Sequence, residues 1–98
     1  MMQVVVTEPA EIDLADIWQW IAEDHPLNAE RYVAFLESKC QSLAKFPRVG
    51  RPREDLGPEC RGLNVDAFII VYRIRNKTVQ VLRVLDGRQD LTKIRIRD

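Results

Sequence analysis

The feature that most constrains the fold is the run Phe68–Arg75, whose first five residues are all apolar. A strand with one wet face alternates apolar and polar residues, so this run is typical of a central strand that is covered on both faces. Shorter strand-like runs lie near residues 60–65 and over residues 78–85, and Asn76-Lys77 is expected to be the turn into the latter. One face of that last strand is expected to carry Val79, Val81, Arg83 and Leu85.

The first half of the chain has a helical period. Over residues 11–23, the side chains of Leu14, Trp18 and Ile21 fall on one helical face, which predicts that Trp18 is in the core. Trp20 points to another side and is expected to be more exposed. Pro26 is disfavoured inside a helix and favoured at its start, so a second helix is predicted from about residue 27 to residue 45. The tight turn between the two predicts an antiparallel helical hairpin.

A β-branched strand over residues 3–7 precedes the hairpin, and the elements then follow the order β-α-α-β-β-β. The sheet needs a cover, and the helical hairpin is the cover that the chain offers. We therefore expect an α+β fold with two layers, a helical hairpin packed on a small, mostly antiparallel sheet. A length of 98 residues fits one domain, 1–98. The tail, residues 86–98, leaves a short helix and an extended segment both open.

No segment approaches the roughly 18 apolar residues of a membrane span, so no membrane association is expected. The N-terminus lacks a basic segment before its short valine run, which predicts no secretory signal and a cytoplasmic location. Cys40 and Cys60 match no metal-binding spacing, and in a reducing cytosol both are expected to be free thiols.

Charge is distributed unevenly along a chain whose net charge is zero. Residues 1–44 carry eight acidic and two basic side chains, so residues 45–98 carry the remaining seven acidic and thirteen basic ones. Such asymmetry fits a positive face aimed at an acidic partner, and equally fits acidic helices that balance a basic sheet.

Two basic segments carry most of the candidate binding residues. The loop Lys45–Arg53 has four cations and no acid, so it either binds anions or is a solvated connection. The segment Arg83–Leu91 holds an Asp86-Gly87 turn beside two arginines, which either face a partner or close an ion-pair network with Asp86 and Asp90.

Motifs for phosphate loops, dinucleotide binding, zinc proteases and serine hydrolases are absent from the sequence. The single histidine, His25, has no serine or cysteine partner nearby and is better explained as a residue at a helix start. We therefore expect no cofactor and no metal. Cleavage of RNA by arginines and lysines that stabilise charge at the phosphate stays open, because it needs no fixed motif.

Several segments together resemble the RelE/ParE toxin superfamily, over nearly the whole chain. The most telling are the loop Phe46–Arg53 with its FP-x-x-G-R pattern, Arg61 beyond it, the strand Phe68–Ile74, and the ending Arg83–Asp90. The loop and the ending look like those of the ParE subgroup, the toxins of type II toxin–antitoxin systems.

This resemblance implies two kinds of activity. RelE-like members cut messenger RNA on the ribosome with basic residues and a tyrosine near the C-terminus, whereas ParE-like members bind DNA gyrase and disturb its cleavage–religation cycle. Here Arg88 matches one basic position, but no tyrosine follows it, and Ile69 stands about where a second catalytic arginine would be. We therefore expect a non-enzymatic gyrase poison with no catalytic residue.

Two alternatives stay open. One is a ribosome-dependent endoribonuclease that uses Arg61, Arg83, Arg88 and Lys93 to stabilise charge. The other is a non-toxic member that acts only with its antitoxin in operon repression.

The resemblance also assigns residues to partners. The side chains expected to face the target are Arg83 and Arg88 first, then Arg51, Arg53 and Arg61. Contacts with a cognate ParD-like antitoxin are expected at Trp20, Tyr32 and Arg73. The antitoxin is expected to wrap the toxin with apolar and acidic contacts, in a hetero-oligomeric complex that binds operator DNA through the antitoxin.

Overall fold

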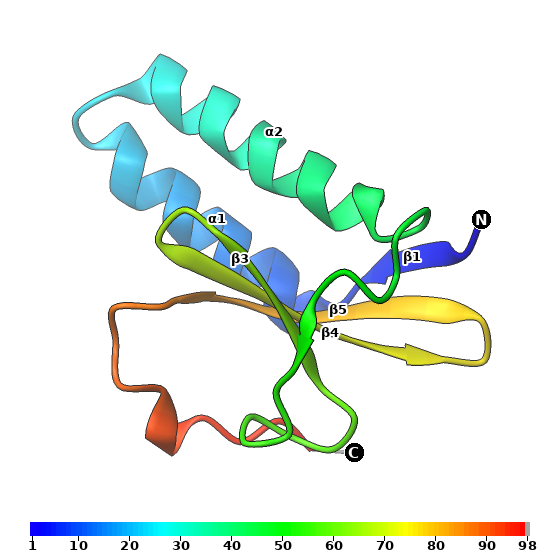
Figure 1. The fold of residues 1–98 in the computed structure, drawn as a ribbon. Coiled ribbons are helices and arrows are strands. Elements are labelled where there is room, and N and C mark those ends of the chain that lie inside the picture. Colours follow the sequence, from blue (N-terminus) through cyan, green and yellow to red (C-terminus); the bar gives the residue numbers. More distant parts are fainter. Residues whose placement is uncertain (98) are drawn as a thin grey trace.

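The computed structural model describes residues 1–97 and places a helical hairpin on one face of a five-stranded sheet (Figure 1). The elements along the chain are β1 (Gln3–Val6), α1 (Glu8–Ala22), α2 (Pro26–Ser42), β2 (Arg51–Pro52), β3 (Arg61–Val65), β4 (Phe68–Arg75), β5 (Thr78–Asp86) and the short 3₁₀ helix η1 (Leu91–Lys93). The strand order is β1-β5-β4-β3-β2, with β1 parallel to β5 and the other pairs antiparallel. The predicted α+β fold is confirmed, and β2 is an additional short strand inside the basic loop.

The strand β4 lies in the middle of the sheet, and every residue from Phe68 to Arg73 is buried. On the face toward the helices, Ile70 and Tyr72 pack in a core that includes Leu14 of α1 and Leu36 of α2. The prediction of a central strand covered on both faces is therefore confirmed on this side by the hairpin.

The opposite face of the sheet is covered by the C-terminal tail. Its core consists of Leu56, Cys60, Ile69, Val71, Leu82 and Leu85, and the tail residues that pack against it are Leu91, Ile94 and Ile96. The backbone N–H of Ile96 donates to the Leu56 carbonyl at 2.7 Å, which fastens the tail to the loop before β3. The tail thus contains both structures that the sequence left open, one 3₁₀ turn followed by an extended segment.

Helix α1 buries Ala10, Leu14 and Ile17, which recur at helical spacing on one face. The prediction that Trp18 is in the core is wrong, because its side chain is 42% exposed. Successive residues of a helix are turned by about 100°, so Trp18 points away from the buried face that Leu14 and Ile17 define. Trp20 is exposed, as expected. None of the described helices is long and apolar enough to cross a membrane.

Strand β5 contains a bulge, because its register with β4 skips Leu82. Before the bulge, Val79 and Val81 share one face, as predicted, and this face lies toward the helices. After it, Val84 faces the helices and Leu85 faces the tail, so the predicted alternation is wrong beyond Val81. An extra residue in one strand moves all later side chains to the other face, and the composition of the strand does not reveal it.

The two cysteines are buried free thiols, as predicted. Cys40 lies in the core under the helices and Cys60 in the core under the tail, so the sheet separates them. Burial raises the pKa of the Cys40 thiol to about 11. Each therefore acts as a small apolar side chain.

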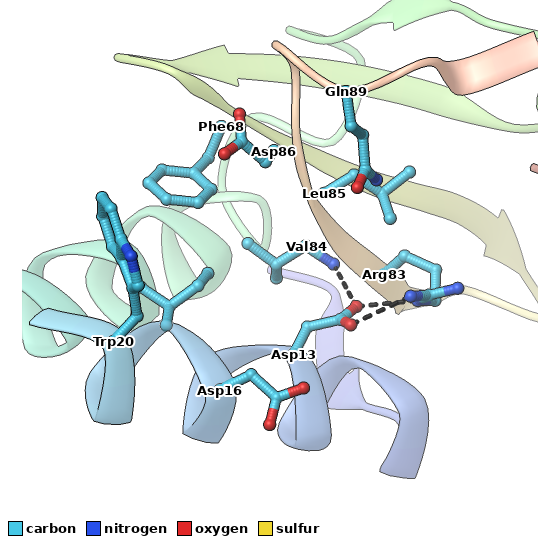
Figure 2. A pocket seen from close by; sticks show the side chains of 10 residues that line it. Asp13, Asp16, Trp20, Phe68, Arg83, Val84, Leu85, Asp86 and Gln89 are labelled. Atoms are coloured by element: carbon cyan, nitrogen blue, oxygen red, sulfur yellow. Dashed lines mark hydrogen bonds and ion pairs between the residues drawn. The ribbon is translucent and has the colours of Figure 1, made fainter.

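Helix α1 is fastened to the edge of β5 beyond the point where β1 ends. The Thr7 backbone N–H and hydroxyl both donate to the Val81 carbonyl, at 3.0 and 2.8 Å. Six residues later, the Asp13 carboxylate accepts from the Val84 backbone N–H at 2.9 Å and from the Arg83 guanidinium at 2.7 and 3.0 Å (Figure 2). These side chains take the place of the missing neighbouring strand and fix the angle of the hairpin over the sheet.

We expect Leu36→Ala to destabilise the protein by about 2–5 kcal/mol, because Leu36 is fully buried and its loss leaves a cavity. Leu27→Ala on the same helix is the matched control, because Leu27 is 74% exposed and should change stability by less than about 0.5 kcal/mol. Urea unfolding followed by circular dichroism measures both values. Equal losses in the two variants would contradict the buried face assigned to α2.

We expect Asp13→Asn to lower the free energy of unfolding by about 1–3 kcal/mol, because the amide loses the ionic bond to Arg83 and one of its two acceptor oxygens. Asp16→Asn, on the same helix, is the control and should stay within about 0.5 kcal/mol, because Asp16 is exposed and pairs with no cation among residues 1–97. Thermal unfolding of both variants distinguishes the two sites, and an unaffected Asp13→Asn would refute the role of this carboxylate.

Candidate functional site

The structure divides the five arginines predicted to face a target into two groups. Three of them are held by carboxylates: Arg53 by Asp55 at 3.0 Å, Arg83 by Asp13 at 2.7 Å, and Arg88 by Asp86 at 2.8 Å. The other two, Arg51 and Arg61, form no ion pair within residues 1–97. The two groups therefore differ in how much of their hydrogen-bonding capacity is available to a partner.

Arg83 is partly buried against α1, and both of its bonds go to Asp13. These bonds raise the pKa of the guanidinium, which stays charged. Since the same carboxylate also binds the Val84 backbone, the first role of Arg83 is to join the helix to the sheet. Asp13, which the sequence analysis did not single out, is the residue that holds Arg83 in place.

Arg88 lies after the Asp86-Gly87 turn and is largely exposed. Its guanidinium and its backbone N–H both donate to Asp86, and these bonds lower the pKa of that carboxyl to about 2. Of the two alternatives for this segment, the ion-pair network is confirmed for Arg88 with Asp86. Asp90 instead accepts from the backbone and hydroxyl of Thr92 and caps η1.

Arg51 and Arg61 lie on the paired strands β2 and β3, where Arg51 is opposite Gly62 and Pro52 is opposite Arg61, so the two side chains leave opposite faces of this strand pair. Arg51 is exposed and Arg61 is half-buried. Arg48, which is also exposed, lies just before them in the same basic loop. These three residues, which we call the arginine corner, carry guanidinium groups without an ion pair around this strand pair: Arg48 and Arg61 line one pocket, and Arg51 leaves the other face.

A contact between Gly50 and Tyr72 positions the arginine corner. The Gly50 backbone N–H donates to the Tyr72 hydroxyl at 2.9 Å, and a Cβ at this position would come within 2.7 Å of that oxygen. Only glycine therefore lets the loop approach β4 so closely, which explains the glycine in the FP-x-x-G-R pattern. Tyr72 is fully buried, and burial raises the pKa of its hydroxyl.

The three residues predicted to contact an antitoxin lie in different environments. Trp20 is exposed and lines a groove between α1 and the end of β5 together with Phe68 and Asp86 (Figure 2). Tyr32 is half-buried, packs on Phe68 with ring centroids 5.9 Å apart, and donates its hydroxyl to Asp66. Desolvation and this hydrogen bond raise the pKa of Tyr32 to about 12.

Arg73, the third of these residues, is buried on the opposite face of the sheet, under the tail. Its guanidinium donates to the Gln80 side chain and to the Arg97 carbonyl. Trp20 and Tyr32 are thus brought to the same aromatic side chain, Phe68, whereas Arg73 is separated from them by the sheet.

Chemically, the arginine corner is suited to binding anions. His25 lies far from it, at the start of α2. Both tyrosine hydroxyls of the chain are engaged, one with Gly50 and one with Asp66. No group of three or more histidine, cysteine or acidic side chains suited to a metal ion occurs in the described part of the chain.

Comparison with known proteins places this arrangement in a family. The family model of the ParE toxin of type II toxin–antitoxin systems (parDE) matches residues 4–91. Toxin ParE3 of Caulobacter vibrioides is 35% identical over 92 residues, which are 93% of this chain and 92% of that protein. Toxin RelE2 of the same organism is 32% identical over 84 residues, covering 86% and 93% of the two chains.

A solved structure agrees with these relatives. A chain from the chromosomal ParDE toxin–antitoxin system of P. aeruginosa superposes with a TM-score of 0.76 at 25% identity, covering 86% of this chain and 94% of that one. The family model, the relatives and the solved structure each cover most of this chain, and the chain belongs to the ParE toxins of type II toxin–antitoxin systems.

Proposed function

We propose that this protein poisons DNA gyrase by binding to it in the cytoplasm, and that a cognate ParD-like antitoxin neutralises it. Membership of the ParE family supports the proposal. In this mechanism the toxin stabilises the state in which gyrase has cut the DNA, so that breaks persist. The protein contributes hydrogen bonds and charge, and it transfers no proton.

The observation that carries the proposal is the arginine corner. Arg51 and Arg61 form no ion pair within the described residues, so their guanidinium groups are available to carboxylates or phosphates of a partner. Arg83, Arg53 and Arg88 are already bound to carboxylates. We therefore place Arg51 and Arg61 first among the target-binding residues, ahead of the other three.

The burial of Tyr72 supports a binding role over a catalytic one. Tyr72 is the tyrosine opposite Arg61 in the sheet, but it is fully buried and its hydroxyl binds Gly50. A general acid or base must reach the proton that it transfers, and a hydroxyl in this position reaches no substrate.

The second candidate function is that of a ribosome-dependent endoribonuclease, and the similarity to Toxin RelE2 favours it. It would use Arg61, Arg83, Arg88 and Lys93. In the structure, two of these four are tied to carboxylates, and Lys93 lies in η1, beyond the end of the sheet. A third possibility is a non-toxic member that represses its operon with the antitoxin, in a hetero-oligomeric complex that binds DNA through the antitoxin.

We expect the double variant Arg51→Glu/Arg61→Glu to lower gyrase poisoning by at least about tenfold, because each charge-assisted hydrogen bond lost is worth about 1.5–3 kcal/mol. The assay incubates purified toxin with gyrase, plasmid DNA and ATP and measures linear plasmid. The fold should be retained, because neither arginine is ion-paired within the described chain.

The matched control reverses two exposed cations elsewhere, Arg31→Glu/Lys77→Glu, and should poison gyrase like the wild type. A parallel reaction supplies programmed ribosomes and messenger RNA. Cut RNA with normal gyrase activity would refute the gyrase proposal in favour of the endoribonuclease. Full poisoning by the Arg51/Arg61 variant would refute the assignment of the arginine corner.

A further inference from the structure

Strand β1 forms one edge of the sheet, and its outer side has no neighbouring strand within residues 1–97. An edge strand offers unpaired N–H and C=O groups to any other strand, and proteins usually protect it with a charged residue, a proline or a bulge. The opposite edge has such protection, because β2 consists of Arg51 and Pro52. Strand β1 has none of these features, since Gln3–Val6 contains three valines and its register with β5 is regular.

The backbone of Val4 and Val6 points out of this edge. The Thr7 N–H donates to the Val81 carbonyl of β5, and backbone direction alternates from one residue to the next along a strand, so Val4 and Val6 point away from β5. The Met2 N–H agrees with this direction, because it donates to a carbonyl outside the sheet at 3.0 Å. Within residues 1–97, the N–H and C=O groups of Val4 and Val6 have no hydrogen-bond partner on this outer side.

These main-chain groups fit a second copy of the same strand in one antiparallel register. A two-fold axis at Val5 places Val4 of each copy opposite Val6 of the other, and each of these two pairs exchanges two main-chain hydrogen bonds. The register that pairs Val4 with Val4 would instead bring Met2 opposite Val6, and the Met2 N–H is already engaged. The register centred on Val5 therefore satisfies both residues that point outward.

The side chains are self-complementary in this register. Val4 and Val6 are half-buried and pack on the core under the helices, so Val5 lies on the other face, where it is 42% exposed. The axis brings Val5 directly against Val5 of the other copy. The Cα atoms of such a pair without hydrogen bonds are only about 4.5 Å apart, so the two side chains pack on each other. On the helix face, the contact of Val4 with Val6 extends the apolar core across the axis.

The charges at the two ends of the edge are also complementary. Met2 donates to the Ala44 carbonyl, which places Lys45 next to the start of the edge. Glu8 lies at the other end, directly after Thr7. The antiparallel register places Glu8 of one copy opposite Met2 of the other, beside its Lys45. Neither Glu8 nor Lys45 forms an ion pair within residues 1–97, so each is available to the second copy.

We infer that two copies of this chain pair through β1 and form one continuous sheet of twice five strands. The contact is isologous, because both copies use the same edge. Since β2 is the strand farthest from β1, the arginine corner of each copy stays at an outer end of this sheet. The pair thus presents two arginine corners, and a target with two matching sites would bind it with avidity. The inference does not depend on which target the toxin has.

Sedimentation equilibrium of the full-length chain without antitoxin tests the pairing. We expect a reversible dimer with a Kd on the order of 10 μM, because the contact is a single short edge. Val5→Asp should raise this Kd by at least about tenfold, because it places two carboxylates directly opposite each other at the axis.

The matched control is Val49→Asp, which changes a 56% exposed valine in a groove beside β3 and should dimerise like the wild type. Because both valines are exposed, both variants should keep the melting temperature that the wild type has at a concentration well below Kd. A chain that stays monomeric at about 1 mM would overturn the inference. Equal weakening of the dimer by Val5→Asp and Val49→Asp would overturn it too.

A charge exchange tests the register independently of Val5. Glu8→Lys and Lys45→Glu should each raise Kd, because each variant brings like charges together at both ends of the edge. The double variant Glu8→Lys/Lys45→Glu should return Kd to within about threefold of the wild type. A double variant that dimerises no better than either single variant would refute the proposed pairing.

Amide hydrogen exchange of the wild type reports on the main-chain bonds. We expect the Val4 and Val6 amides to exchange at least about threefold more slowly at about 1 mM protein than at about 0.05 mM, because the monomer fraction falls. Exchange of these two amides at the same rate at both concentrations would show that the edge stays open and would overturn the inference.

Discussion

The fold depends on a central strand that is buried on both faces. Every residue of β4 from Phe68 to Arg73 is buried, so a sheet built around this strand is stable only if other segments of the chain pack on both of its faces. The helical hairpin covers one face, and the tail with the loop around Leu56 covers the other. The hairpin needs an anchor at the edge where β1 stops, and Thr7 and Asp13 supply it. The conformation of the tail and the angle of the helices both follow from the burial of this strand.

The position of the arginine corner follows from the same strand. Tyr72 belongs to β4, and its buried hydroxyl needs a hydrogen-bond partner. The partner is the backbone N–H of Gly50, so the loop is held against the sheet where β2 begins. Arg51 and Arg61 are thereby placed on adjacent strands at the surface. A requirement of the core, the satisfaction of one hydroxyl, thus determines where the unpaired cations are presented.

Local signals in the sequence were sufficient for most of the fold. The apolar run of β4, the period of α2 and the Asn76-Lys77 turn, whose residues both have positive φ, were each predictable from neighbouring residues. Whether an arginine forms an ion pair was predictable only where its carboxylate partner is close in the sequence. Arg88 and Asp86 are two residues apart, whereas Arg83 and Asp13 are 70 apart and meet only once the helix lies on the sheet. The bulge in β5 and the burial of Arg73 under the tail depend on tertiary packing in the same way.

The parallel pairing of β1 with β5 has a consequence for when the chain can fold during its synthesis. β1 is synthesised first, yet its one neighbour in the sheet is the last strand, and the register joins Gln3 to Thr78. Contacts of such long sequence separation form late and slow the folding of a chain. During translation the first strand waits unpaired while the helices and three further strands emerge from the ribosome. Any activity that needs the complete sheet therefore begins only after β5 has been synthesised, which sets a delay between the start of translation and the appearance of a folded toxin.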